Sequence, residues 1–128
     1  MDIIIKNIYN DIIELSDLCL QKKLWLNKNN NTGQISSYVE LMCRLFDDNN
    51  FDDFIDNKTH EMNFDKEVIY ELKNLRTLLN NYSEKFTDAE IIKDPKWENI
   101  SLQAKKIMIY RIFENSFLLF LQNNHSCI

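Results

Sequence analysis

The hydrophobic positions of the chain recur mostly at steps of three and four residues, the spacing that gathers side chains on one face of an α-helix. The clearest pattern is a run of seven residues: Phe64, Val68, Leu72, Leu75, Leu79, Tyr82 and Phe86. A second pattern of this kind covers residues 2 to 26, with Ile5, Ile8, Ile12, Leu15 and Cys19 on the apolar face. We predict one long amphipathic helix for each run.

Between these two helices the sequence predicts a shorter one. Ser37 and Glu40 have the spacing of a capping box, and apolar residues follow until the polar run at residues 47–50. A short amphipathic turn comes next, and the polar stretch after it ends at Asn63, which we expect to cap the following helix. The apolar residues of that turn are Phe51, Phe54 and Ile55.

The most apolar stretch, residues 94–122, is the one around which the chain is organised. Asp94 and Pro95 form a helix start, with a second possible start at Ser101, and Thr87 and Glu90 have capping-box spacing for a short turn before it. The apolar side of this helix is predicted to hold Ile109, Ile112, Phe113, Phe117 and Phe120. A helix that is apolar on nearly every side must be wrapped by others.

These patterns predict an all-α fold. We expect a single domain of residues 1–128, a compact bundle of four principal helices plus short helical turns, with the C-terminal helix central. One Gly and one Pro in 128 residues leave little material for hairpin turns or glycine-rich phosphate loops. Trp25 and Trp97 are expected to cover an end of the bundle rather than to bind a partner.

Composition favours a soluble protein of the cytoplasm. The 45% hydrophobic and 27% charged content is ordinary for a globular chain. The first residues contain no secretory signal, and charges interrupt the most apolar segment, so we expect no membrane span. Three cysteines, an odd number without CxxC spacing, are expected to be free thiols in a reducing compartment; they are Cys19, Cys43 and Cys127.

Candidate chemistry is sparse. His60 begins HEMNF rather than the HExxH of a zinc protease, and His125 with Cys127 has no second pair to complete a zinc site. No GxSxG or nucleotide loop occurs in the sequence. We therefore expect no enzyme, no cofactor and no metal, although a carboxylate-only enzyme stays open as a third hypothesis, because acid pairs are recognised by geometry.

Charge is concentrated in one segment. Residues 47–67 hold eight acidic residues and two lysines, a net charge of −6, in a chain whose total is −5. The segment is either a solvated loop or a docking surface for a basic partner with an aromatic anchor. A calcium loop starting at Asp48 fails, because Asp53 stands where glycine is needed and Thr59 where the bidentate glutamate is needed. The candidate partner-binding residues are Asp47, Asp48, Phe51, Asp52, Asp53, Asp56 and Glu61.

Two segments, YVELMCRLFDDNNFDDFI (38–55) and DPKWENISLQAKKI (94–107), resemble small all-helical bacterial immunity proteins of contact-dependent growth inhibition and related polymorphic toxin systems. The resemblance implies binding to one toxin domain, often a nuclease, without chemistry. The acidic charge disfavours direct nucleic-acid binding and suits a mimic of nucleic acid. We expect a monomer in a 1:1 complex with the C-terminal domain of a cognate toxin. The alternative is a helical regulatory or adaptor protein that binds a partner helix or peptide in an apolar groove.

Overall fold

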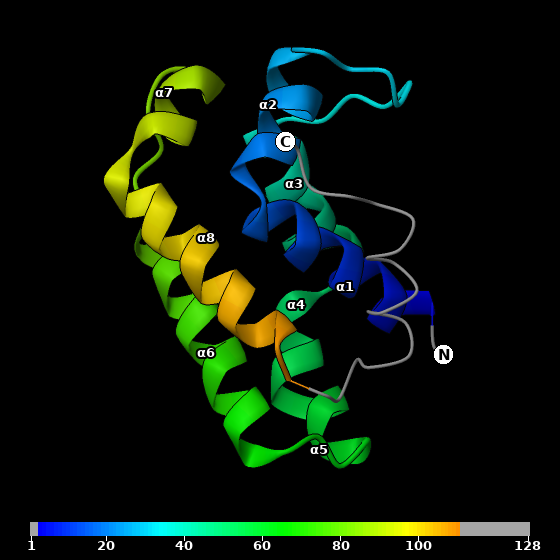
Figure 1. The fold of residues 1–128 in the computed structure, drawn as a ribbon. Helices are drawn as coiled ribbons and strands as arrows, with labels where there is room; N and C mark the ends of the chain where they lie inside the picture. The colour runs from blue at the N-terminus through cyan, green and yellow to red at the C-terminus, as the bar shows by residue number, and fades with distance from the viewer. Residues whose placement is uncertain (1–2, 111–128) are drawn as a thin grey trace.

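The computed structural model describes residues 3–110, and every regular element in that range is helical, which confirms the all-α prediction. The longer elements, in chain order, are α1 (Ile3–Ser16), α2 (Leu18–Leu26), α6 (Lys66–Asn81) and α8 (Pro95–Met108). Shorter helices lie between them (Figure 1): α3 (Tyr38–Met42), the π-helical η1 (Cys43–Asp48), α4 (Phe51–Asp53), the π-helical η2 (Phe54–Lys58), α5 (Thr59–Glu61) and α7 (Asp88–Lys93).

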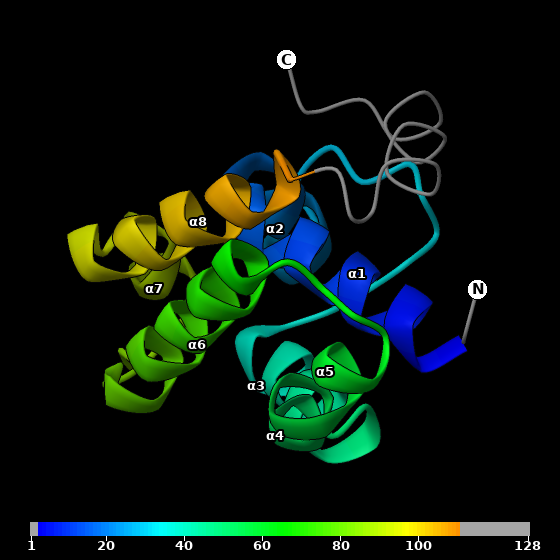
Figure 2. The same cartoon turned by 90° about the horizontal axis from the view of Figure 1, so that it is seen from below.

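Helix α8 is central, as predicted. It packs against both α1 and α6, and it runs antiparallel to α6, with which it lies side by side (Figures 1 and 2). Its buried face includes Ile100, Ala104 and Ile107. The helix ends at Met108, and Ile109 is exposed rather than buried, so the prediction was wrong for that residue. The remainder of the predicted helix, residues 111–122, lies outside the described residues.

Three helix starts are fixed by the capping residues that the sequence predicted. The backbone N–H groups of Glu40, Glu90 and Lys96 donate to side-chain oxygens at 3.0, 3.2 and 3.1 Å. The acceptors are Ser37 Oγ, Thr87 Oγ1 and Asp94 Oδ1, and Pro95 follows Asp94 at the first helical position.

The prediction that Asn63 caps the third helix was wrong. Asn63 takes a left-handed backbone conformation with φ 57°, and α6 begins after Asp65 instead. The polar stretch before it is mostly helical, because Thr59 is buried and its hydroxyl donates to the Ile55 carbonyl at 2.7 Å.

The first predicted helix is broken in two at Asp17. The Asp17 carboxylate accepts the Leu20 N–H at 3.0 Å, and its extended backbone (φ −126°, ψ 95°) ends α1 and starts α2. An aspartate inside an apolar pattern therefore acts as a cap rather than as a helix-interior residue, since its side chain competes for the backbone. The break lets α2 turn away from the axis of α1 (Figure 1).

The third helix ends earlier than its pattern predicted. Tyr82 is extended (φ −77°, ψ 130°) and stops α6, and Phe86 beyond it is 100% exposed. Tyr82 is held instead by the start of α8, where its hydroxyl donates to Asp94 Oδ2 at 2.8 Å. The prediction of a continuous helix through Phe86 was therefore wrong.

An aromatic cluster forms the core at the junction of α2, α3 and α8. Trp97 is fully buried, and its ring centroid lies 5.9, 5.4 and 5.2 Å from those of Trp25, Tyr38 and Tyr82. The Trp97 indole N–H donates to the buried Gln21 Oε1 at 2.8 Å. Neither tryptophan is an exposed binding anchor, as the sequence predicted.

The cysteines differ from one another. Cys43 is an exposed free thiol. Cys19 is half-buried, and Cys127 lies outside the described residues. No helix within residues 3–110 has both the length and the apolar character that a membrane crossing requires.

Ser101 in α8 offers a test of the core. Its hydroxyl is the one buried side-chain polar atom within residues 3–110 that has no hydrogen-bond partner. Replacing it by alanine removes an unpaired polar group and improves helix propensity. We expect Ser101→Ala to raise the free energy of unfolding by about 1 kcal/mol in urea titrations.

The matched control is Ser36→Ala. Ser36 is buried as well, but its hydroxyl donates to Glu14 Oε2 at 2.8 Å and accepts from Arg44. This variant should lose about 1–3 kcal/mol, because its partners stay buried without it. Equal effects of the two substitutions would contradict the assignment of Ser101 as unpaired.

Candidate functional site

The acidic segment is a packed helical spiral rather than a loop. Within residues 47–61, α4, η2 and α5 follow one another without a break, after a turn at Asn50 with φ 48°. Phe51, Phe54 and Ile55 point into the core and are buried. Because these side chains anchor the spiral, the acidic residues between them occupy fixed positions on its outer side.

Phe51 is not available as a surface anchor, which corrects the prediction made for it. It is 0% exposed and packs between Phe46 and Phe54, with ring centroids 5.6 and 6.5 Å away. Removing an aromatic ring from water stabilises the folded protein, whereas an exposed ring contributes little to stability. The phenylalanines of this segment are therefore part of the hydrophobic core.

The acidic residues themselves remain at the surface. Asp47, Asp48, Asp52, Asp56 and Glu61 are exposed, and Asp53 is half-buried with its carboxylate accepting from Asn57 at 2.7 Å. We call the six residues the acidic surface: Asp47, Asp48, Asp52, Asp53, Asp56 and Glu61. The sequence prediction for these six stays a prediction.

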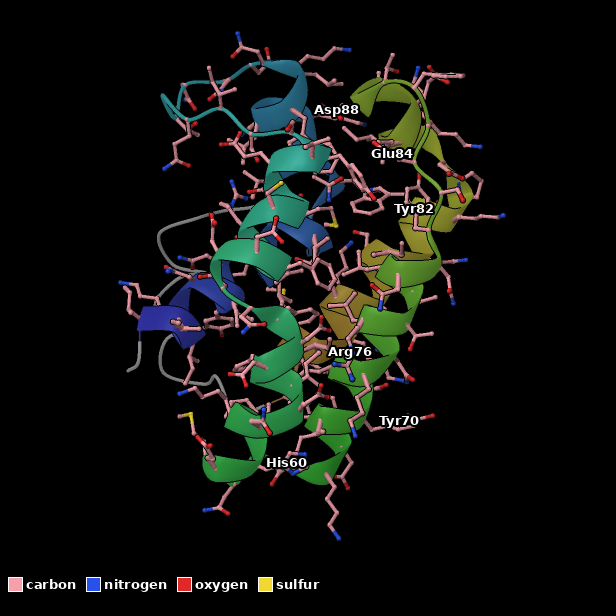
Figure 3. All side chains as sticks on the ribbon, turned by 180° about the vertical axis from the view of Figure 1, so that it is seen from behind. His60, Tyr70, Arg76, Tyr82, Glu84 and Asp88 are labelled. Atoms are coloured by element: carbon pink, nitrogen blue, oxygen red, sulfur yellow. The ribbon has the colours of Figure 1, made fainter. Side chains whose placement is uncertain are left out.

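Arg76 neutralises part of the acidic surface. It reaches from α6 toward the spiral (Figure 3), and its guanidinium lies 3.2 Å from Asp52 and 3.0 Å from Asp56. The hydrogen bond from Arg76 lowers the pKa of the Asp56 carboxyl. Asp47, Asp48 and Glu61 make no such pair within residues 3–110. The uncompensated charge therefore lies at the end of η1, before the turn at Asn50, and at the last residue of the spiral.

A buried carboxylate that the sequence did not single out lies beside the start of this spiral. Glu14 on α1 accepts Arg44 Nη2 at 2.7 Å through Oε1. Its Oε2 accepts the Trp25 indole N–H at 3.0 Å and the Ser36 hydroxyl at 2.8 Å. One carboxylate thus joins α1, α2, the 27–37 connection and η1.

Asp11, one turn earlier on α1, shares the same arginine. It accepts Arg44 Nε at 3.2 Å and the Asn49 amide at 3.1 Å. Burial raises the pKa of Asp11 to about 6, against the lowering effect of Arg44 and Asn49, and the charge of Glu14 raises it further. Arg44 therefore faces two carboxylates with a single positive charge.

A cavity of about 530 Å³ opens next to this network, and we call it the Arg44 cavity. Its polar lining continues into the acidic surface through Asp48. Ile35, 78% exposed, stands at its apolar side with Leu24. The remaining lining residues are Asn7, Asn10, Asp11, Glu14, Gln34, Ser36, Arg44 and Asn49.

Sequence reasoning missed the Arg44 cavity because its parts come from distant segments. Asp11 and Glu14 lie three residues apart within an apolar run, which is the only local signal. Arg44, 30 residues from Glu14, carries no signal of its own. Two acidic residues on the apolar part of a helix need a positively charged partner when they are buried. This pattern could have indicated the Arg44 cavity.

A second groove, of about 450 Å³, runs between α5 and α6 near His60 and Tyr70 (Figure 3). Phe64 and Ile69 form its apolar part, and Lys66 and Lys73 its charged part. No group of three or more histidine, cysteine or acidic side chains within residues 3–110 is placed to hold a metal ion.

Comparison with known proteins adds nothing to this geometry: no protein-family model, no curated protein and no solved structure matches the chain.

The raised pKa of Asp11 predicts a pH dependence of stability. Between about pH 4 and pH 6 the unfolded chain releases the Asp11 proton while the folded protein retains it, so the free energy of unfolding falls as the pH rises. The fall amounts to about 3 kcal/mol and is complete by about pH 7, once the folded protein has also released the proton. The Asp11→Asn variant should lack this pH-dependent fall in the free energy of unfolding, whereas the Asp47→Asn variant should retain it.

Two measurements check this prediction. Urea titrations from pH 4 to pH 7 give the free energy of unfolding of each variant, and carbon-13 NMR of the Asp11 carboxyl gives its titration midpoint. A midpoint at pH 4 or below, or parallel stability curves for the parent chain and Asp11→Asn, would contradict it.

Proposed function

We propose that this chain is an immunity protein, which binds a cognate bacterial toxin domain in the cytoplasm and neutralises it without performing chemistry. Binding occurs through the acidic surface, with the toxin presenting basic residues. The observation that supports this proposal is the packing of the acidic segment. Leu45 of η1 and Phe51, Phe54 and Ile55 of the spiral are buried, so the acidic residues of both parts are held at fixed positions.

Fixed charges favour a docking role over a solvated loop. A preorganised surface loses little conformational freedom on binding, whereas a mobile acidic loop would have to be ordered first. Uncompensated carboxylates at Asp47, Asp48 and Glu61 attract a basic partner and speed its encounter. Asp52 and Asp56, paired with Arg76, contribute less to that attraction.

A nuclease toxin fits this chemistry best. A nuclease binds phosphates with arginine and lysine side chains, and its substrate groove is therefore basic. A surface of carboxylates at fixed positions, on a protein with net charge −5, is complementary to such a groove. The two segments that resemble immunity proteins include most of the acidic surface, residues 47–55.

Co-expression tests the function directly. The terminal domain of the reading frame immediately upstream in the source genome is expressed in bacteria alone and together with this chain. We expect growth arrest with the domain alone, recovery with both, and co-purification in a 1:1 complex. A harmless neighbour, or recovery without a complex, would contradict the proposal.

A charge reversal tests the acidic surface within that complex. In the triple variant Asp47→Lys, Asp53→Lys and Glu61→Lys, the attraction becomes repulsion, and we expect the dissociation constant to rise at least tenfold by isothermal titration calorimetry at ~150 mM salt. Asp52 and Asp56 are left in place because their reversal would repel Arg76 and disturb the fold.

The control reverses an equal charge at the other end of the molecule. Glu84 lies at the end opposite His60 (Figure 3), and Glu90 and Glu98 lie on α7 and in the first turn of α8. The variant Glu84→Lys, Glu90→Lys and Glu98→Lys should bind within threefold of the parent chain, with the same helical circular dichroism. If both triple variants lost the same affinity, the effect would come from net charge alone, and the acidic surface would not be the contact surface.

The second candidate function is a helical adaptor, favoured by the groove between α5 and α6. Its apolar wall and its lysines suit an amphipathic peptide with acidic residues. A partner that protects Phe64 and Ile69 rather than the spiral from amide hydrogen exchange would favour this function over the first.

A further inference from the structure

The Arg44 cavity has an excess of negative charge. Asp11, Glu14 and Asp48 contribute three carboxylates to its lining, and Arg44 contributes the only cationic side chain in it. The guanidinium is already engaged by Asp11 at 3.2 Å and by Glu14 at 2.7 Å. An anion placed there would meet these two carboxylates, so the cavity suits a cation.

Free hydrogen-bond acceptors face the cavity. Asp48 is exposed, and no hydrogen bond or ion pair within residues 3–110 engages its carboxylate. Each carboxylate oxygen of Asp11 accepts a single hydrogen bond although it has two lone pairs. Side-chain amides of Asn7, Asn10 and Gln34 add further carbonyl acceptors around them.

The cavity also has an apolar side. Ile35 is 78% exposed, although it is flanked by Ser36, which is buried in the Glu14 network. Leu24 lines the cavity near it. A ligand with an alkyl chain and a cationic head would cover Ile35 with the chain and place the head among the carboxylates, as lysine and arginine side chains do.

We propose that the Arg44 cavity binds one lysine or arginine side chain of the partner protein, with its alkyl chain against Ile35 and its cationic group between Asp48 and Asp11. This inference rests on the proposed function, since a protein partner supplies the side chain. At about 530 Å³ the cavity lies within the range that accommodates such a group. It would act as a central, partly desolvated anchor next to the acidic surface.

A small-molecule probe tests the cavity without the partner. The full nitrogen-15-labelled chain is titrated with N-butylguanidinium chloride and, at the same ionic strength, with the neutral isostere N-butylurea. We expect saturable changes in the amide resonances of Ile35, Ser36, Arg44 and Asn49. The urea should bind at least tenfold more weakly, because it has no charge for the carboxylates.

Matched variants localise the charge effect. Asp48→Asn removes a carboxylate that lines the cavity, and Asp47→Asn removes its sequence neighbour, which does not line it. We expect at least a threefold rise in the dissociation constant of the guanidinium probe for the first variant and less than a 1.5-fold change for the second. Equal effects would overturn the inference.

The inference would also be overturned if the changes did not saturate, if the neutral probe bound equally well, or if the affected resonances lay elsewhere in the chain. Its failure can be told apart from failure of the proposed function. Growth recovery without probe binding would contradict only the proposal that the Arg44 cavity binds a cationic side chain. Probe binding without growth recovery would support cation binding in the Arg44 cavity and contradict the proposal that the partner is a toxin domain.

Discussion

The buried carboxylate of Glu14 is the interaction on which much of this structure depends. It collects hydrogen bonds from Arg44, Trp25 and Ser36, which come from three different parts of the chain. A buried charge is tolerated only when it is paired and fully hydrogen-bonded, so these partners must all be in place together. The contact between α1 and η1, and with it the position of the acidic spiral, follows from that requirement.

The neighbouring tryptophans link this network to the core. Trp25 donates to Glu14 and packs its ring against Trp97, which in turn donates to Gln21. Gln21 returns to α1 through a hydrogen bond to the Glu14 backbone carbonyl at 2.8 Å. The break in the first helix at Asp17 is what permits this return, because a straight helix would carry Gln21 and Trp25 away from Glu14.

Sequence patterns predicted the parts of the fold that depend on interactions between residues close together in the chain. The apolar spacing of Val68, Leu72, Leu75 and Leu79 within α6, and the capping residues Ser37, Thr87 and Asp94, were predicted correctly, since each effect acts within one helical turn. The break at Asp17 was missed, because the same residue type can lie on a wet face or cap a helix. The π-helical turns η1 and η2 have no signal in a pattern with a period of 3.6.

The candidate site was only half predictable. Its acidic residues are visible in the sequence as a run of charge, and they are exposed. Phe51 was misread as a surface anchor because its acidic neighbours suggested exposure, whereas the ring is drawn into the core. The Arg44 cavity depends on contacts between Arg44 and residues 30 and 33 positions earlier, and no local pattern carries such pairings.

The acidic surface is held in place by η1 and the packed spiral and is not a solvated loop. Amide hydrogen exchange of the free, full-length protein tests it most directly, because exchange reports local opening of each backbone hydrogen bond. We predict slow exchange at the N–H groups of Phe54 and Met62, which donate at 3.0 Å to the carbonyl oxygens of Asn50 and Lys58, at rates comparable with those in α6. Exchange there as fast as in the 27–35 connection would contradict it.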